Sequence, residues 1–207
     1  RDSHSFPTRR SSVRSAFAGC SSLTSVNIPN GVTEISGSAF SGCTSLTSVT
    51  IPESVTTIGS YVFQNCSSLT SIKIPNSVTT IGEDAFSGCL SLSSLVLPNS
   101  VTKIGIGAFR GCSLTSINIP DGVTEISGSA FAGCSSLTSV NIPNSVTFIS
   151  SYAFSNCSSL TSIKIPNSVK NIGYGAFEGC TNLTAQRPAA KTTWTASYLG
   201  CKAVTTY

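Results

Sequence analysis

Apolar and polar residues alternate in short segments that recur along most of the chain. In the first clear example, Val26 and Ile28 alternate with Ser25 and Asn27, and a proline follows. A period of two residues is typical of a short strand with one buried face. Proline fits only at the end of such a strand, because it has no N–H to donate to a sheet ladder. The pattern therefore predicts short strands that each end at a proline.

A second apolar segment and a turn complete the unit. An Asn-Gly or Asn-Ser pair after the proline supplies turn residues, and Val32 and Ile35 then return to the core. The motif A-F-x-G-C comes next, as in Ala39-Phe40 and Gly42-Cys43. We expect it to form a single helical or 3₁₀ turn that places the phenylalanine under the next strand.

The unit repeats with a nearly constant length. Phenylalanines recur every 23 residues from Phe17 to Phe177, with one step of 22. Each of these phenylalanines is followed by a cysteine and then by a leucine. A fixed period of this size indicates a solenoid. The predicted structural core consists of these columns: Phe40, Phe63, Phe86, Phe109, Phe131 and Phe154; Leu46, Leu69, Leu92, Leu137 and Leu160; Cys43, Cys66, Cys89, Cys134 and Cys157.

One unit is too small to bury its own apolar side chains, so the turns must stack on their neighbours. We predict a β-rich solenoid, a right-handed parallel coil of about eight turns of 22–23 residues. Its short strands run parallel on one side, and 3₁₀ or helical turns form the other side. The single residue lost between Cys112 and Leu114 falls in a turn, where it need not exchange the two faces of a strand.

Three segments are expected along the chain. Residues 4–12 resemble a translated sequencing adapter, so 1–14 is expected to be a non-native tail or a disordered basic arm, and the chain a fragment of a longer one. Residues 15–184 form the solenoid. Residues 185–207 form a C-terminal cap or a degenerate ninth repeat. Polar and proline residues after Leu183 predict that the strand there is disrupted.

A four-turn block is duplicated within the solenoid. Residues 27–89 and 118–180 align without a gap, and most positions are identical. The pairs Lys73 and Lys164, and Tyr61 and Tyr152, should therefore be presented twice, about 19 Å apart at ~4.8 Å per turn. Repeated features of this kind suit weak multivalent contacts.

Charge excludes one class of partner. The chain has 12 Lys+Arg and 8 Asp+Glu, but four of the arginines lie in the first 14 residues, against one aspartate. The remaining chain is nearly neutral and carries no basic stripe, so we expect no nucleic-acid partner. No uncharged apolar run reaches the ~18 residues of a membrane helix, so no membrane insertion of this segment is expected either.

Candidate chemistry is sparse. The repeated cysteines form one column whose side chains point the same way, which is unsuitable for disulfides or for a converging metal site. We therefore interpret them as buried thiols that pack as small hydrophobic groups. The only histidine is His4, in the excluded tail. Without another histidine, Ser–His and Cys–His catalysis is not available. The sequence thus predicts no enzyme, no metal and no cofactor.

The repeated motifs carry a family resemblance. L-x-x-V-x-I-P, followed by V-T-x-I and A-F-x-G-C, is similar to the BspA-type leucine-rich repeat family over residues 16–184. The resemblance implies an extracellular or cell-surface, non-enzymatic module for adhesion or protein–protein interaction. The implied partners are host or neighbouring-cell surface or matrix proteins, and glycans are possible partners. A structural spacer that projects another domain is the alternative, followed by a glycan-binding or ice-binding face.

The outward positions of the predicted strands are the candidate contact surface. Small hydroxyl and amide side chains there form two exposed columns, and two tyrosines lie near the opposite edge of the coil. The same columns could instead be solubilising decoration. The residues are Ser25, Asn27, Ser48, Thr50, Ser71, Lys73, Val96, Asn118, Asn141, Ser162, Lys164, Tyr61 and Tyr152.

Overall fold

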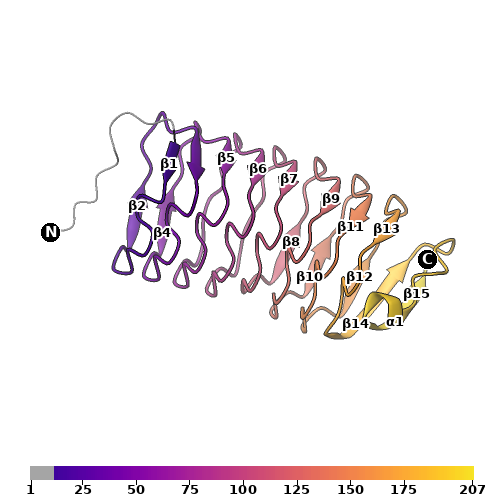
Figure 1. Cartoon of the computed structure of the whole chain (residues 1–207). Helices are drawn as coiled ribbons and strands as arrows, with labels where there is room; N and C mark the ends of the chain where they lie inside the picture. Colours follow the sequence, from indigo (N-terminus) through magenta and orange to yellow (C-terminus); the bar gives the residue numbers. More distant parts are fainter. Residues whose placement is uncertain (1–11) are drawn as a thin grey trace.

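The chain is a parallel β-solenoid whose turns stack along one axis (Figure 1). This computed structural model describes residues 12–207, with side chains from residue 15 onward. Strand β1 (Ser12–Arg14) and the C-terminus lie at opposite ends of the rod (Figure 1). Almost all regular structure is short parallel strand, as the repeat predicted.

The V-T-x-I segments form what we call the second face. β1 (Ser12–Arg14), β3 (Glu34–Ser36), β5 (Thr57–Ile58), β6 (Thr80–Ile81) and β7 (Lys103–Ile104) make one parallel sheet. β9 (Glu125–Ile126), β11 (Phe148–Ile149) and β13 (Asn171–Ile172) make another. The break between the sheets falls at the 22-residue repeat. The shortened turn therefore interrupts strand pairing, but Ile104 in β7 and Ile126 in β9 remain buried on either side of the break.

The L-x-x-V-x-I segments form the first face. β2 (Ser25–Asn27) pairs with β4 (Ser48–Thr50), and β8 (Ser116–Asn118) pairs with β10 (Ser139–Asn141). β12 (Ser162–Lys164) pairs with β14 (Cys180–Arg187), which pairs with β15 (Cys201–Thr206). The equivalent residues 71–75 and 94–98 are not in strands. The prediction of a strand in every turn is therefore wrong for these two turns.

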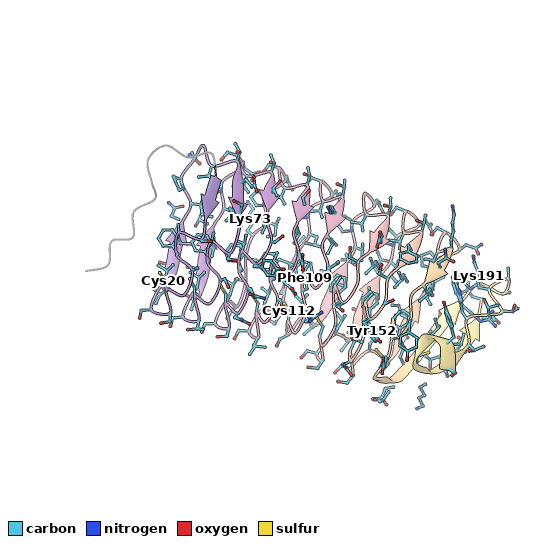
Figure 2. The ribbon with its side chains drawn as sticks, in the orientation of Figure 1. Cys20, Lys73, Phe109, Cys112, Tyr152 and Lys191 are labelled. Carbon is cyan, nitrogen blue, oxygen red and sulfur yellow. The ribbon has the colours of Figure 1, made fainter. Side chains whose placement is uncertain are left out.

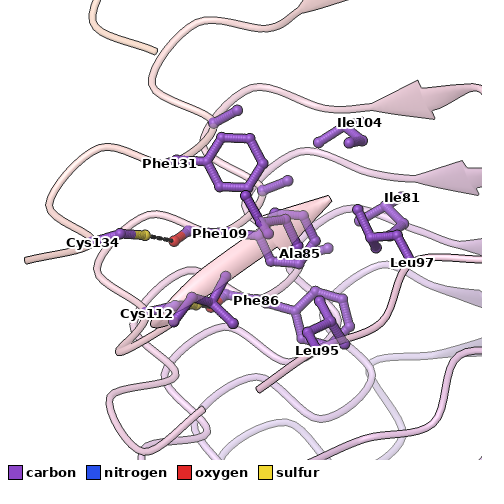
Figure 3. Packing of buried hydrophobic residues seen from close by; sticks show 14 of the residues in the cluster. Ile81, Ala85, Phe86, Leu95, Leu97, Ile104, Phe109, Cys112, Phe131 and Cys134 are labelled. Carbon is purple, nitrogen blue, oxygen red and sulfur yellow. Dashed lines mark hydrogen bonds between the residues drawn. The ribbon is translucent and has the colours of Figure 1, made fainter. Parts of the chain in front are cut away.

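The core is a set of aligned columns inside the coil. Successive phenylalanine rings stack with centroids 5.2–5.5 Å apart. Figure 3 shows part of this column at Phe86, Phe109 and Phe131. All of the phenylalanines, leucines and cysteines named above as the predicted core are fully buried. Because each ring contacts the ring above and below it, burial is complete only when the turns are stacked.

The A-F-x-G-C segments form isolated turns on the side between the two faces. The Cys43 N–H donates to the Phe40 carbonyl at 3.1 Å, the i+3 to i pattern of a 3₁₀ turn. The Phe40 N–H donates instead to Val62 O in the next turn of the coil, at 2.9 Å. The turns thus add a further ladder of backbone hydrogen bonds between neighbouring coils.

The strand after Leu183 is continuous, contrary to our prediction. β14 is the longest strand of the described chain, and it pairs with β12 through Ile163 and Ala185. The paired residues Ile163 and Ala185 are 22 positions apart in the sequence, whereas paired residues in regular turns are 23 apart. The strand is therefore shifted by one position. The slip turns Ala185 inward, where it is fully buried, and Gln186 outward. A one-residue slip exchanges the faces of a strand, which is why the polar residues are accommodated.

The C-terminal segment continues the coil with β15, which pairs with β14. It contains α1 (Ala196–Leu199), whose N-cap Thr195 accepts a hydrogen bond from Tyr198 N–H. Phe177 N–H donates to Leu199 O at 3.1 Å, which continues the ladder of the A-F-x-G-C turns. The Tyr207 hydroxyl donates to Ile165 O at 2.7 Å. These contacts fasten the segment to the last regular turn.

At the other end, strand pairing begins earlier than predicted. β1 pairs with β3 in register through Val13 and Ile35. Residues 12–14 therefore belong to the coil rather than to the expected tail. The remainder of the segment that resembles an adapter lies outside the described residues.

Candidate functional site

A groove of ≈ 970 Å³ runs over the second face. We call it the second-face groove. One rim is the column formed by the first residue of each strand, and strand register aligns the members of each sheet. The rim residues are Glu34, Thr57, Thr80, Lys103, Glu125 and Phe148. The opposite rim includes Tyr61, Glu83, Ile106 and Ser151.

Glycine and serine make the floor of the groove. Gly59, Gly82 and Gly105 lie two residues after their rim residues, and Ser36, Ser127 and Ser150 take the same position in other turns. A Cβ on Gly82 or Gly105 would lie 2.5 Å from a backbone atom of the preceding turn. The missing side chains therefore let the turns approach closely, and they leave the floor low and flat.

Carboxylates dominate the charge of the groove. Glu34, Glu83 and Glu125 line it together with one cation, Lys103. The Tyr61 hydroxyl donates to Glu83 Oε1 at 2.9 Å, and the hydrogen bond raises the pKa of Tyr61. The Ser150 hydroxyl donates to Glu125 Oε1 at 2.8 Å. The groove is thus a weakly acidic surface that is open to solvent.

Two of the predicted contact residues have a left-handed backbone. Tyr61 has φ 61° and Tyr152 has φ 59°. Equivalent positions in other turns also have positive φ, and they hold serine, aspartate or glycine, as at Gly107 and Gly175. A bulky residue with positive φ is an outlier that costs on the order of 1–2 kcal/mol. Of the two tyrosines, only Tyr61 lines the second-face groove; Tyr152 packs edge-on against Tyr174, with centroids 5.8 Å apart.

The remaining predicted contact residues lie on the first face. Strand pairing aligns their columns within β2–β4 and within β8–β10, and the side chains are exposed. Lys73 and Val96 line a smaller cavity of ≈ 480 Å³ in the region without strands, and Val96 is 79% exposed. Lys164 places its Nζ 4.4 Å from the ring centroid of Tyr207. The two duplicated lysines therefore have different surroundings. Lys73 and Tyr152 are labelled in Figure 2.

The cysteine column joins the turns together. The eight cysteines from Cys43 to Cys201 are free thiols. From Cys43 to Cys180, each Sγ donates to the carbonyl of the phenylalanine 25 or 26 residues earlier, at 3.0–3.2 Å. Figure 3 shows this bond at Cys134. Burial raises the pKa of Cys43 to about 11 and that of Cys134 to about 12. These thiols therefore stay protonated at neutral pH, and they act as hydrogen-bond donors as well as small apolar groups.

The described residues contain no group of three or more His, Cys, Asp or Glu side chains that could hold a metal ion. None of the helices within residues 12–207 has the length and apolar character that crossing a membrane would require. The groove on the second face is open and extends over several turns of the coil.

Our sequence analysis located the exposed columns of the first face but missed the second-face groove. The signal was present as a column of glycines at Gly59, Gly82 and Gly105. A glycine two residues after the rim position in three consecutive turns indicates close backbone stacking.

A family model agrees with the repeat. The model described as BspA type leucine rich repeat region (6 copies) matches residues 5–113 and 102–198. A search of curated proteins finds no match.

Three solved structures are similar to this one. A leucine rich cell surface protein from Faecalibacterium prausnitzii is 37% identical over 80% of this chain and 48% of its own, with a TM-score of 0.74. The leucine rich repeat protein of T. pallidum is 34% identical over 94% of this chain and 80% of its own, with a TM-score of 0.67. A leucine-rich repeat protein from Bacteroides ovatus is 33% identical over 81% and 58%, with a TM-score of 0.63. The chain thus spans about half the length of two of these relatives.

Proposed function

Because the chain belongs to the BspA-type leucine-rich repeat family, we propose that it is a non-enzymatic adhesion module of an extracellular or cell-surface protein. Its partners are surface or matrix proteins of a host or of a neighbouring cell. The similar protein from Faecalibacterium prausnitzii is described as a cell surface protein, which supports this location.

The observation that carries the proposal is the second-face groove. It extends over strands β3 to β11, and its rims combine charged, hydroxyl and aromatic side chains. The surface is held on a coil whose core columns are fully buried. A rigid scaffold of this kind presents a binding surface without paying a large ordering entropy when it binds.

The proposal is tested by measuring binding of the purified chain to immobilised matrix proteins and to intact cells. The first variant combines Lys73→Ala and Lys164→Ala, which remove the duplicated lysines of the first face. The second combines Tyr61→Gly and Tyr152→Gly, which remove the two tyrosines without leaving a side chain at positive φ. Thermal melting establishes that each variant is folded.

We expect at least one variant to weaken binding about tenfold, which corresponds to about 1.4 kcal/mol. If the folded chain binds neither proteins nor cells, it acts as a spacer that projects another domain, and the adhesion proposal is wrong. Binding on a glycan array, with none to proteins, would instead assign the chain to carbohydrate recognition.

A further inference from the structure

We propose that the second-face groove binds an extended polypeptide segment that carries two basic side chains about six residues apart. This inference rests on the proposed adhesion function and names the chemical class of its partner. It follows from the shape of the groove, its charge, the strained residue at its rim and the differences between the two duplicated blocks.

The groove has the dimensions of an extended peptide. It runs from Glu34 in β3 to Phe148 in β11, a distance of five turn intervals, or about 24 Å at ~4.8 Å each. An extended chain rises about 3.3 Å per residue, so the groove accommodates about seven residues. The glycine and serine floor has few side chains in the way, and a peptide backbone can approach it closely.

Charge selects a basic segment. Glu34 and Glu125 lie on the same rim four turns apart, which is about 19 Å. This separation exceeds the ~8 Å screening length at physiological salt, so each carboxylate acts as an independent site for a cation. Two lysines or arginines six positions apart in an extended segment match the spacing. Glu83 on the opposite rim adds negative charge, and Lys103 is the one cation of the groove.

Tyr61 is the proposed aromatic anchor. The tyrosine lies on the rim with a left-handed backbone at φ 61°, and Glu83 Oε1 accepts its hydroxyl hydrogen bond. Glycine occupies the equivalent position at Gly107 without strain. Residues with a strained backbone cluster at functional sites, so the position of Tyr61 on the rim supports its role as an anchor.

The two duplicated blocks differ where the groove lies. Thr57 is replaced by Phe148 and Gly59 by Ser150 in the second block, and Glu83 is replaced by Tyr174. By contrast, the first-face pairs Ser48 and Ser139, Ser71 and Ser162, and Lys73 and Lys164 are identical. Four of the ten groove residues in the first block thus have a different residue in the second block, against one of five first-face residues, Thr50, which corresponds to Asn141. This difference is expected of a surface that recognises one asymmetric ligand.

The probe is a fluorescently labelled nine-residue Gly/Ser peptide with lysines at its second and eighth positions. Its binding to the whole chain is measured by fluorescence polarisation. One comparison peptide has the two lysines side by side, and another has glutamates in their place. The test variant combines Glu34→Gln and Glu125→Gln. The matched control combines Glu53→Gln and Asp121→Asn, two exposed carboxylates outside the groove, so both variants lose the same charge.

We expect the Glu34→Gln/Glu125→Gln variant to raise the Kd for the spaced-lysine peptide about tenfold and the control to change it less than about twofold. Tyr61→Gly should raise the Kd about threefold without lowering the melting temperature, because it relieves backbone strain. The peptides with adjacent lysines or with glutamates should bind more weakly than the spaced peptide.

An equal effect of the test and control variants would overturn the proposal, since the attraction would then be non-specific. The peptide proposal would also be overturned if a neutral maltooligosaccharide binds and the spaced peptide does not. If the Kd of the maltooligosaccharide is unchanged by Glu34→Gln/Glu125→Gln, the ligand class is then a glycan. In either case, undiminished binding of the chain to cells or matrix proteins leaves the adhesion function standing. If the wild-type chain itself binds neither cells nor matrix proteins, the adhesion function is contradicted, whatever the result with the peptides.

Discussion

A methyl group added at Gly82 tests how closely the turns of the coil are stacked. Gly82 lies on the floor of the second-face groove, and its N–H donates to Ile58 O in the preceding turn at 2.7 Å. A Cβ at this position would lie 2.5 Å from the carbonyl carbon of Gly59 and 2.6 Å from the nitrogen of Ser60. Both atoms belong to the backbone, so no side chain can rotate away to make room.

The magnitude follows from these distances. Carbon atoms in contact are normally about 3.5–4.0 Å apart, so Gly82→Ala forces a local separation of about 1 Å. A gap of that size forfeits a quarter to a half of the dispersion energy of the affected contacts, and it lengthens the hydrogen bond to Ile58. Overpacking of this kind costs about 1–3 kcal/mol. We expect Gly82→Ala to lower the free energy of unfolding by about 2–3 kcal/mol.

Gly128→Ala is the matched control. The nearest atom to a Cβ on Gly128 is the Ser151 carbonyl oxygen, at an ordinary contact distance of 3.5 Å, and Gly128 has no positive φ. Alanine there reduces the entropy of the unfolded chain and should stabilise the protein by up to about 1 kcal/mol. The assay is urea unfolding followed by circular dichroism. Equal free energies of unfolding for the two variants would refute the close stacking of the glycine column.

Three further predictions concern the core, the thiols and the strained tyrosine. Phe109→Ala removes a buried ring that stacks on both neighbours, at 5.4 and 5.5 Å, and should lower the free energy of unfolding in urea by about 3–5 kcal/mol, whereas Phe109→Leu should cost less. Burial raises the pKa of Cys134 from 9.0 to about 12. Between pH 9 and about 12 the thiol is therefore ionised in the unfolded chain and protonated in the folded chain, so the free energy of unfolding falls as the pH rises. The slope is at most about 1.4 kcal/mol per pH unit for one thiol, and Cys134→Ala should remove that share in urea titrations at several pH values. Tyr152→Gly should raise the melting temperature measured by calorimetry if relief of the strain at φ 59° outweighs loss of the contact with Tyr174, whereas Tyr152→Ala, which keeps a Cβ at positive φ, should not.

Most of the fold could be predicted from the sequence because the apolar core residues recur at regular intervals, and only stacked turns can bury them. Phe63 and its equivalents recur every 23 residues with one step of 22, and a ring column can be buried only if the turns align. The strand at Ala185 could not be predicted in the same way. Its side chains are compatible with two registers that differ by one residue, and only pairing with β12 selects the register that buries Ala185.

The candidate site was less accessible to sequence analysis. Exposure of first-face residues such as Lys73 follows from the alternation within a strand, so that column was predictable. The second-face groove depends on how far the side chain of Tyr61 and its neighbours project above a floor of Gly59 and Gly82. That height difference arises from stacking of turns and is not a property of any one repeat. The hydrogen bond from Cys134 to Phe109 also depends on stacking, since it joins two turns.

Duplication of the four-turn block does not give the module two equal sites. Glu34 of the first block, Lys103 of the segment between the blocks and Glu125 of the second block all line the second-face groove. The groove is therefore a single site that extends from one block into the other. On the first face, Tyr207 covers Lys164, and Lys73 has no such neighbour among the described aromatic contacts. The second-face groove, which spans about five turn intervals, therefore carries different residues along its length. A single chain should then bind one extended ligand in one direction, and multivalent adhesion would require several chains on the same surface.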